Sequence, residues 1–193
     1  MSVDQSVPSQ LAETASAANR AGKYLTFRLA AEEYGLEILK VREIIGLMNV
    51  TRVPRTPEYI RGVINLRGKV IPVLDLRNKF GMGHADDTEE TCIIVVEAEF
   101  DGESVLMGVV VDGVSEVLDI QAEEIEDAPA FGTNVDTNFI LGIGKVKDTV
   151  KILLDIDAVL TASDLSVMHG IESKSKVQAI ADEKVEEEVL ETA

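Results

Sequence analysis

The sequence repeats itself, and this repeat constrains the fold more than any other feature. Three blocks recur in the same order in both halves: 34–45 with 107–118 at an offset of 73, then 60–63 with 140–143 and 70–76 with 150–156 at an offset of 80. Ordered blocks, two of which share one offset, predict a duplicated unit.

Each predicted copy is short, the first covering about 23–83 and the second about 90–160. A unit of about 65–80 residues buries too little surface to be comfortably stable alone. Two such units packed side by side can share a core, and the seam between them then forms a groove. Grooves between packed units are common binding sites.

Composition indicates that the units are built from strands. The chain is 46% hydrophobic but has no Trp and only 4% aromatic residues, so Val, Ile and Leu must form the core, and these residues favour strands. The predicted strand segments are Tyr24–Leu29, Glu37–Ile45, Lys69–Leu76, Cys92–Phe100, Val105–Asp112 and Thr149–Ile156. Pro72 suggests an edge or bulge position. Many short strands with frequent turns predict small β-barrels.

Helices are predicted to be few and short. Thr56, Pro57 and Glu58 have the pattern of an N-cap, a first-turn proline and an acidic first turn, and Gly62 stands where such a helix would end. Further helical turns are expected at 76–80 and from Asp155 or Asp157 to Leu160.

The two ends of the chain differ from the globular part, 23–165. Residues 1–22 are rich in Ser, Ala and Gln, which predicts a disordered leader. Residues 166–193 form an acidic tail whose apolar spacing fits an amphipathic helix and equally a frayed segment. No secretory signal or membrane-spanning run is present, and Cys92 has no partner for a disulfide, which favours the cytosol.

Charge is distributed unevenly along the chain. The net charge of −17 argues against binding to nucleic acid or to anionic membranes. Residues 23–83 nevertheless hold eleven Lys/Arg against six Asp/Glu, while residues 84–169 hold three against twenty. One interpretation is an ordinary solvated surface. The other is a polarised molecule whose basic side meets an acidic partner.

No residue pattern of an enzyme, metal site or cofactor site is recognisable. His84 and His169 lie in polar segments, and Cys92 begins an apolar run that is typical of a core thiol. Asp75 and Asp155 could be paired acids of a small β-barrel hydrolase or ligand binder. The repeat explains them more simply as equivalent residues at strand ends, so we predict a protein that is not an enzyme.

One turn distinguishes the first copy from the second. Residues 65–68 read Asn-Leu-Arg-Gly, whereas the second copy has Lys-Val-Lys-Asp at 145–148. The simple interpretation is a hairpin in which Gly68 supplies positive φ and Arg67 points to solvent. The functional interpretation is that the turn presents Arg67 as a fixed donor.

At these residues the chain resembles the CheW chemotaxis coupling-protein family. The resemblance rests on residues 33–44, 56–68, 71–77 and 108–118, and extends from about 23 to 162. It implies a mainly β fold with two SH3-like five-stranded barrels packed around a shared core, and short helices. It also implies a cytoplasmic adaptor, without a cofactor, that couples chemoreceptors to the histidine kinase CheA in membrane-associated receptor arrays.

The implied partners are the cytoplasmic tip of a chemoreceptor and the regulatory domain of CheA, itself a similar double barrel. An alternative is a CheW-like domain of a CheV-type protein or of another two-component scaffold. CheV needs a receiver domain after the coupling domain, for which residues 166–193 are too few, so we expect a complete adaptor.

The candidate docking residues follow from the resemblance and from the groove idea. A receptor helix would lie against apolar side chains at the seam, with polar residues at the rim. Val41, Ile44 and Val117 are the apolar candidates for the receptor, with Arg67 and Glu43 at the polar rim. Gly62 and the surrounding turn are candidates for placing the surface that meets the kinase. The candidates are Val41, Glu43, Ile44, Gly62, Asn65, Arg67, Gly68 and Val117.

Overall fold

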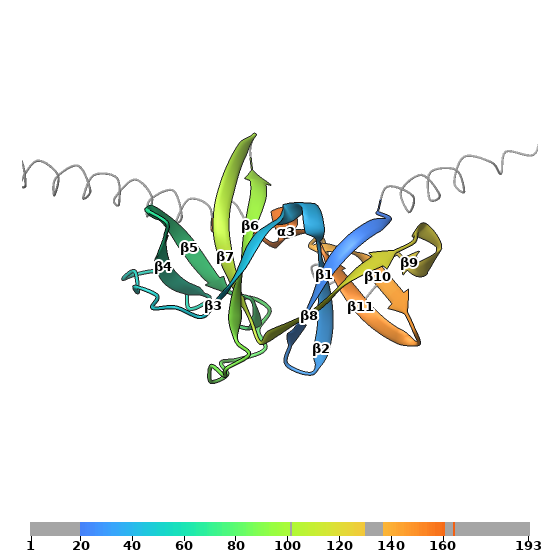
Figure 1. Cartoon of the computed structure of the whole chain (residues 1–193), viewed down its shortest axis with the longest axis horizontal. Helices are drawn as coiled ribbons and strands as arrows, with labels where there is room; N and C mark the ends of the chain where they lie inside the picture. The colour runs from blue at the N-terminus through green and yellow to red at the C-terminus, as the bar shows by residue number, and fades with distance from the viewer. Residues whose placement is uncertain (1–19, 101, 130–136, 161–163, 165–193) are drawn as a thin grey trace, which may run out of the picture.

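The computed structural model describes residues 20–100, 102–129, 137–160 and 164, and these form two twisted sheets (Figure 1). Their strands are β1 (Gly22–Leu29), β2 (Glu32–Glu37), β3 (Val41–Gly46), β4 (Ile60–Leu66), β5 (Lys69–Asp75), β6 (Cys92–Phe100), β7 (Glu103–Val111), β8 (Gly113–Ile120), β9 (Ile125–Glu126), β10 (Ile140–Val146) and β11 (Thr149–Leu154). The short helices are η1 (Ile38–Lys40), α2 (Leu76–Lys79), η2 (Ala122–Glu124) and α3 (Ile156–Val159). In these described parts of the chain, no helix has both the length and the apolar character needed to cross a bilayer.

The two sheets confirm the mainly β, two-barrel prediction. One sheet has the order β3-β6-β7-β5-β4, and the other has the order β8-β1-β2-β11-β10-β9, in which β9 adds a two-residue sixth strand. Figure 1 shows the first sheet on the left and the second on the right. Below, they are called the left barrel and the right barrel.

The strands exchange between the barrels. β1 and β2 belong to the right barrel with β8, β10 and β11, whereas β6 and β7 belong to the left barrel with β3, β4 and β5. Each contiguous copy in the sequence, about 23–83 and about 90–160, therefore contributes strands to both barrels. This reciprocal exchange ties the barrels together, because neither can close its sheet with strands from one copy alone.

The strand register matches the repeat residue by residue. β2 pairs with β11 in parallel with Gly35 opposite Leu153, and β7 pairs with β5 in parallel with Gly108 opposite Val73. These are the two offsets of the sequence, 73 between the glycines and 80 between their partners. A Cβ on Gly35 would lie 2.9 Å from Leu153 Cδ2, so the strands approach too closely for a side chain there.

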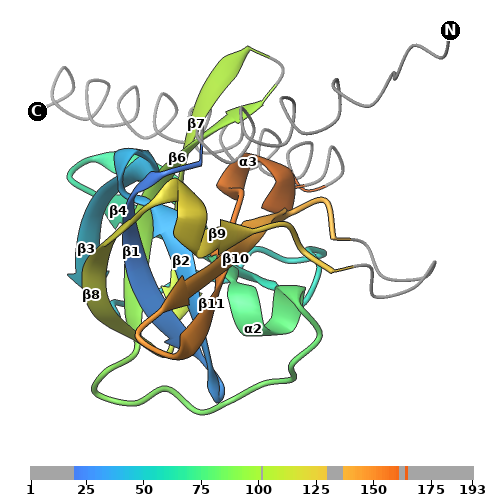
Figure 2. The ribbon, with the colours of Figure 1, turned by 90° about the vertical axis from the view of Figure 1, so that its right-hand side faces the viewer.

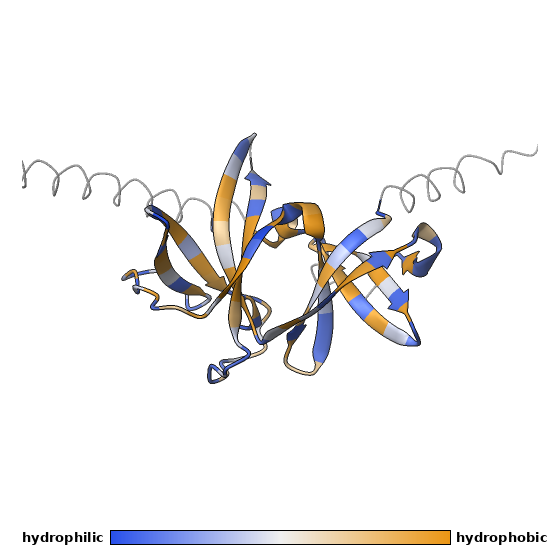
Figure 3. Ribbon diagram, in the orientation of Figure 1, coloured by the Kyte–Doolittle hydropathy of each residue, from blue (hydrophilic) through white to orange (hydrophobic). Residues whose placement is uncertain are grey.

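Three apolar clusters fill the molecule. One is shared between the barrels and contains Phe27, Leu36, Val96 and Met107 among its buried residues. Smaller clusters, around Ile64 and around Leu153, fill the left and the right barrel. Figure 3 shows apolar residues along the strands that line the space between the sheets and polar residues at the hairpin tips. The large shared cluster explains why the two barrels form one unit.

A row of stacked aromatic rings crosses the shared core. Phe27 stacks on Tyr34 at 5.9 Å between ring centroids, Tyr34 on Phe80 at 6.1 Å, and Phe80 on Phe139 at 5.0 Å. These spacings fall within the range at which aromatic pairs attract one another. Four of the eight aromatic residues of this chain are thus stacked in the core that the two barrels share.

Local signals misled the prediction at three places. The helix predicted at 56–62 is wrong, because this segment makes turns and then enters β4 at Ile60. Thr51, before the segment, and Val63, in β4, exchange two backbone hydrogen bonds of 2.9 Å. The segment predicted as one strand over Glu37–Ile45 is broken by η1. β5, which contains Pro72, is an interior strand, but its ladder with β7 begins only at Val73, so the missing proline N–H breaks no bond of that ladder.

The predicted leader, 1–22, overlaps the fold at its end. Arg20 donates to the carbonyl oxygen of Leu141 at 2.6 Å and forms an ion pair with Asp127 at 2.7 Å, and β1 begins at Gly22. Residues 1–19 and the predicted tail at 166–193 lie outside the described residues.

Candidate docking surface

The turn between β4 and β5 is rigid and presents a charged side chain. Arg67 and Gly68 have φ values of 50° and 86°, the pattern of a type I′ hairpin turn. The side-chain oxygen of Asn65 accepts a hydrogen bond of 2.8 Å from the backbone N–H of Gly68, which braces the turn. The equivalent turn of the other copy, at Lys147 and Asp148, also has two positive φ values.

Arg67 reaches back from this turn to strand β3. Its Nη1 and Nη2 atoms donate to the two carboxylate oxygens of Glu43 at 2.9 and 2.8 Å. The Arg67 side chain is 78% exposed and that of Glu43 is 25% exposed. The pair therefore lies at the surface, with one face of the guanidinium turned to solvent and its direction fixed by two parallel bonds.

Strand β3 alternates between core and surface. Val41 packs against the shared core, and Ile45 packs against the left-barrel core. Ile44 points the other way and is 45% exposed. Val41 thus supports the surface from beneath, whereas Ile44 is available for contact.

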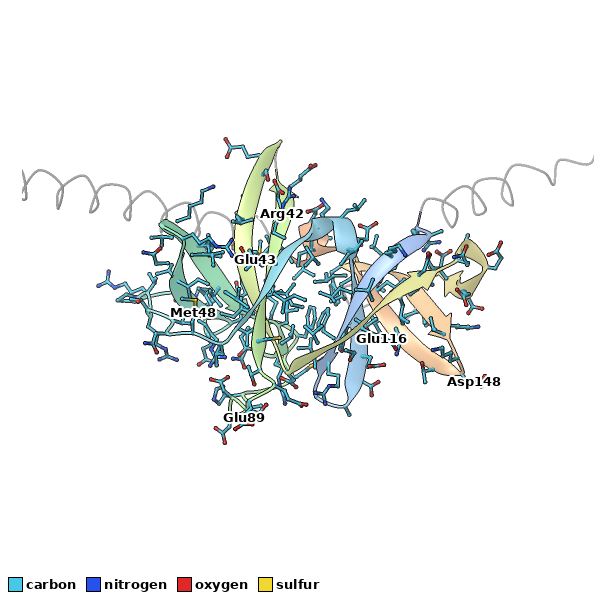
Figure 4. The ribbon with its side chains drawn as sticks, in the orientation of Figure 1. Arg42, Glu43, Met48, Glu89, Glu116 and Asp148 are labelled. Carbon is cyan, nitrogen blue, oxygen red and sulfur yellow. The ribbon has the colours of Figure 1, made fainter. Side chains whose placement is uncertain are left out.

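Strand β8 repeats this arrangement in the right barrel. Val117 is the equivalent of Ile44 at the offset of 73 and is 49% exposed, whereas Val114, the equivalent of Val41, packs against the shared core. Figures 1 and 2 show β3 and β8 on the same side of the molecule, with α2 on the opposite side. Figure 4 shows Glu43 and Glu116, which precede the two exposed aliphatic residues, on this same face.

These residues define the β3/β8 face: Glu43, Ile44, Arg67 and Val117, with Val41 beneath them. The structure joins Arg67 to Glu43 and exposes Ile44 and Val117 on the same side of the molecule, and Asn65 and Gly68 act by shaping the turn that carries Arg67. An exposed apolar pair flanked by a held charge pair is suited to contact with another molecule.

Gly62 has a different environment. It is buried in β4, paired with Val73 directly after a bulge, and has a φ of +140°. A Cβ there would lie 2.0 Å from the carbonyl oxygen of Thr51. Gly62 therefore lets the loop between β3 and β4 pack closely on the barrel, and it offers no surface of its own.

Two further surface residues were not chosen from the sequence. Met48, just after β3, is 40% exposed, and Arg42 lies on the outward side of β3 with an ion pair to Glu97. Figure 4 shows both on the molecule's near side. The alternation of β3 could have indicated Arg42, because residues 42 and 44 share a face of the strand.

The acidic pair considered for catalysis has a structural use. Asp75 accepts a hydrogen bond from the N–H of Asn78, and Asp155 accepts from those of Asp157 and Ala158, so each carboxylate caps a short helix at a strand end. The backbone N–H groups of Asp75 and Asp155 bond equivalently, to the carbonyls of Tyr59 and Phe139. Each aspartate caps its own helix in its own barrel. Cys92, the core thiol expected from the sequence, is half-buried, and burial raises the pKa of its thiol.

Comparisons with known proteins agree with this architecture. The CheW-like domain family matches residues 23–164. The chemotaxis protein CheW of Klebsiella aerogenes is 41% identical over 149 residues, which cover 77% of this chain and 87% of that protein. The CheW of Bacillus subtilis is 35% identical and shares 72% of this chain and 86% of its own length.

A solved CheW structure and a longer CheV protein are also similar to this chain. The scaffolding protein TtCheW from Thermoanaerobacter tengcongensis superposes with a TM-score of 0.65 at 39% identity, covering 75% of this chain and 95% of that one. The chemotaxis protein CheV3 of Helicobacter pylori is 30% identical, but the match covers only 40% of its length. With its interleaved double barrel and a family match over 23–164, this chain belongs to the CheW family of chemotaxis adaptor proteins.

Proposed function

We propose that this protein couples chemoreceptors to the histidine kinase CheA, with the β3/β8 face as its receptor-binding surface. The observation that carries this proposal is the exposure of Ile44 and Val117, at equivalent positions of the two barrels, beside the Arg67–Glu43 pair. The membership of the CheW family supports the choice of partners.

The receptor would be recognised as a helix against an apolar surface. The tip of a chemoreceptor is a helical hairpin, and a helix of this kind can place an apolar stripe along Ile44 and Val117. Burying two half-exposed aliphatic side chains supplies part of the binding free energy without loss of the core, because neither residue holds the barrels together. Arg67 would then supply orientation, since its guanidinium already has a fixed direction.

The kinase would be bound through contacts between a barrel of this protein and a barrel of the CheA regulatory domain. The regulatory domain of CheA is expected to be a similar double barrel, and two such units can associate head to tail into rings or lattices. The basic excess of residues 23–83 and the acidic excess of 84–169 suit such alternation. If binding of the kinase proved independent of salt, this electrostatic part of the proposal would fail.

We further propose that the protein acts in the cytoplasm, at receptor arrays, and that it carries out no reaction of its own. The use of Asp75 and Asp155 as helix caps supports this view over a hydrolase that would pair them. A CheV-type protein is the nearest alternative, and the higher identity to CheW of Klebsiella aerogenes, 41% against 30% for CheV3, favours the adaptor.

Reconstitution tests the proposal. Receptor-containing membranes, CheA and this protein are combined, and autophosphorylation of CheA is measured with each component omitted in turn. We expect activation of the kinase, and its control by receptor ligand, only when all three are present. The coupling role would be overturned if omitting this protein left receptor-controlled autophosphorylation of CheA unchanged. It would also be overturned if the protein co-sedimented with neither receptor nor kinase.

A further inference from the structure

The left barrel has a hollow that the proposed coupling role does not use. It lies under the loop between β3 and β4 and has a volume of about 720 Å³. Arg52, Arg55 and His84 line it together with Glu58 and a floor that includes Pro57 and Ile60. A second hollow of about 420 Å³ adjoins it and shares Arg52, Glu58 and His84.

The two arginines of this loop carry uncompensated charge. Among the described residues, neither Arg52 nor Arg55 has an ion-pair or hydrogen-bond partner, whereas Arg61 nearby is held by Asp87 through two bonds of 2.9 and 2.6 Å. Arg52 and Arg55 are exposed. Figure 4 shows nitrogen-tipped side chains gathered at this end of the molecule. The wall of the hollow thus combines two available guanidinium groups with one acidic side chain, Glu58.

The loop is held in shape, so its arginines are presented and not merely mobile. Thr51 is fixed to Val63 by two backbone hydrogen bonds, and Thr56 donates to the carbonyl oxygen of Val53 at 2.9 Å. Pro54 and Pro57 restrict φ on either side of Arg55, which itself has a φ of 63°. A preorganised pair of arginines beside apolar residues is the chemistry that recognises acidic peptide segments.

The chain leaves the described structure beside this hollow. Asp164 is fully buried, accepts a hydrogen bond from the hydroxyl group of Tyr59, and forms an ion pair of 2.5 Å with Lys79. Tyr59 and Lys79 are the direct neighbours in sequence of Glu58 and Asn78, and both of these line the hollow. Asp164, the last described residue, is therefore held by two residues whose sequence neighbours line the hollow.

The C-terminal segment contains a matching sequence. Residues 182–191 read Asp-Glu-Lys-Val-Glu-Glu-Glu-Val-Leu-Glu, six acids against one lysine, with three aliphatic residues among them. Asp182 follows Asp164 by eighteen residues, and a flexible chain of that length spans about 25 Å on average. Acidic and aliphatic residues together complement the arginines and the apolar floor of the hollow.

We propose that residues 182–191 bind within the same molecule to the hollow lined by Arg52 and Arg55. The segment covers the basic end of the left barrel, so an acidic partner must displace it to reach that end. This inference does not depend on the coupling role, because its contacts are all within one chain.

Paramagnetic broadening in the full-length protein tests the inference. A spin label is attached at Thr192→Cys in a Cys92→Ala background with an unchanged melting temperature, and amide peaks are compared with the label oxidised and reduced. We expect a several-fold loss of intensity in the loop between β3 and β4 at low salt. The loss should largely disappear at about 1 M salt, where the Debye length is about 3 Å.

Charge variants give the matched controls. Arg52→Glu with Arg55→Glu should abolish the broadening, whereas Lys69→Glu with Lys147→Glu, the same change of charge at two other exposed lysines without partners among the described residues, should leave it. Glu186→Arg, Glu187→Arg and Glu188→Arg, combined with Arg52→Glu and Arg55→Glu, should restore it. Unbroadened loop peaks, equal losses in both charge variants, or broadening only between a labelled and an isotope-enriched copy would overturn the inference.

Discussion

Arg67 and Glu43 join the hairpin turn of the first copy to the strand that carries Ile44. Two nearly equal bonds, of 2.9 and 2.8 Å, connect the guanidinium to the carboxylate, although the Arg67 side chain is 78% exposed. An exposed ion pair contributes about 0–1 kcal/mol to folding. The pair therefore orients the arginine more than it stabilises the barrel, and this distinction can be measured.

We predict that Arg67→Ala or Arg67→His weakens binding to soluble receptor hairpins about tenfold, because arginine is enriched among the residues that carry most of the binding free energy and about 1.4 kcal/mol corresponds to a tenfold change. The melting temperature should change little. Pull-down or calorimetric titration gives the affinity, and a thermal melt gives the stability. Lys147→Ala, at the equivalent turn of the other copy, is the control that should bind normally. Unchanged binding would remove Arg67 from the interface.

The exposed aliphatic residues allow a second test of the same face. Ile44→Ser and Val117→Ser should each change the free energy of unfolding by only about 0.5 kcal/mol, because both side chains are half-exposed. Receptor binding should fall for each variant and further for the double variant. Denaturant melts and receptor co-sedimentation separate the two effects. Normal binding by the double variant would contradict the placement of the receptor on the β3/β8 face.

The repeat predicted much of this architecture because strand ends and turns are set by short stretches of sequence, and these stretches recur in both copies. Equivalent blocks fixed which residues end strands and which make turns, and the helix caps at Asp75 and Asp155 agree with that equivalence. The exchange of strands between barrels could not be read in the same way, since alternation of apolar residues says which face is buried but not which sheet a strand joins. The strand pairings of the structure, Gly35 with Leu153 and Gly108 with Val73, reveal it.

The candidate site was predictable in part for a similar reason. Val41 and Ile44 are both aliphatic residues of β3, yet one packs on the shared core and the other is exposed. Alternation along β3 places these two residues, three positions apart, on opposite faces, but it does not say which face the core covers. The helix predicted at 56–62 failed because the bonds between Thr51 and Val63, far apart in sequence, outweigh a local cap signal.

Gly62 should be intolerant of any side chain. Its φ of +140° disfavours other residues, and a Cβ would lie 2.0 Å from a backbone carbonyl oxygen that cannot move without breaking the bond of Thr51 to Val63. Gly62→Ala should therefore cost about 3 kcal/mol or more in free energy of unfolding. Chemical denaturation measures this cost. Gly46→Ala, which meets nothing within 4 Å, is the matched control and should cost far less.

The carboxylates of Asp75 and Asp155 should matter for stability and not for coupling. Replacing either by Ala removes a helix cap and should cost about 1 kcal/mol, whereas Asn, itself a good cap, should cost a few tenths. The double variant Asp75→Asn/Asp155→Asn should support receptor control of CheA as the native protein does. Loss of coupling in a folded double Asn variant would instead revive a chemical role for the pair.

Two neighbouring glutamates on β2 should respond to pH in opposite directions. Burial raises the pKa of Glu37, with Asp155 adding repulsion, whereas a hydrogen bond from Lys151 lowers the pKa of Glu33. A carboxyl with a raised pKa is favourable to folding below the ordinary value of 4.5 and loses that advantage as the pH rises through its folded pKa. A carboxyl with a lowered pKa contributes above that ordinary value and loses its contribution as the pH falls through its folded pKa.

Glu37→Gln should therefore raise the free energy of unfolding at pH 7, and this gain should shrink as the pH falls below about 4.5. Glu33→Gln should lower stability at pH 7, because it leaves the buried Lys151 without its carboxylate partner, and the loss should diminish in acid. Urea denaturation at a series of pH values compares the two variants with the native chain. If both substitutions shifted stability in the same direction at pH 7, the buried environment assigned to Glu37 would be wrong.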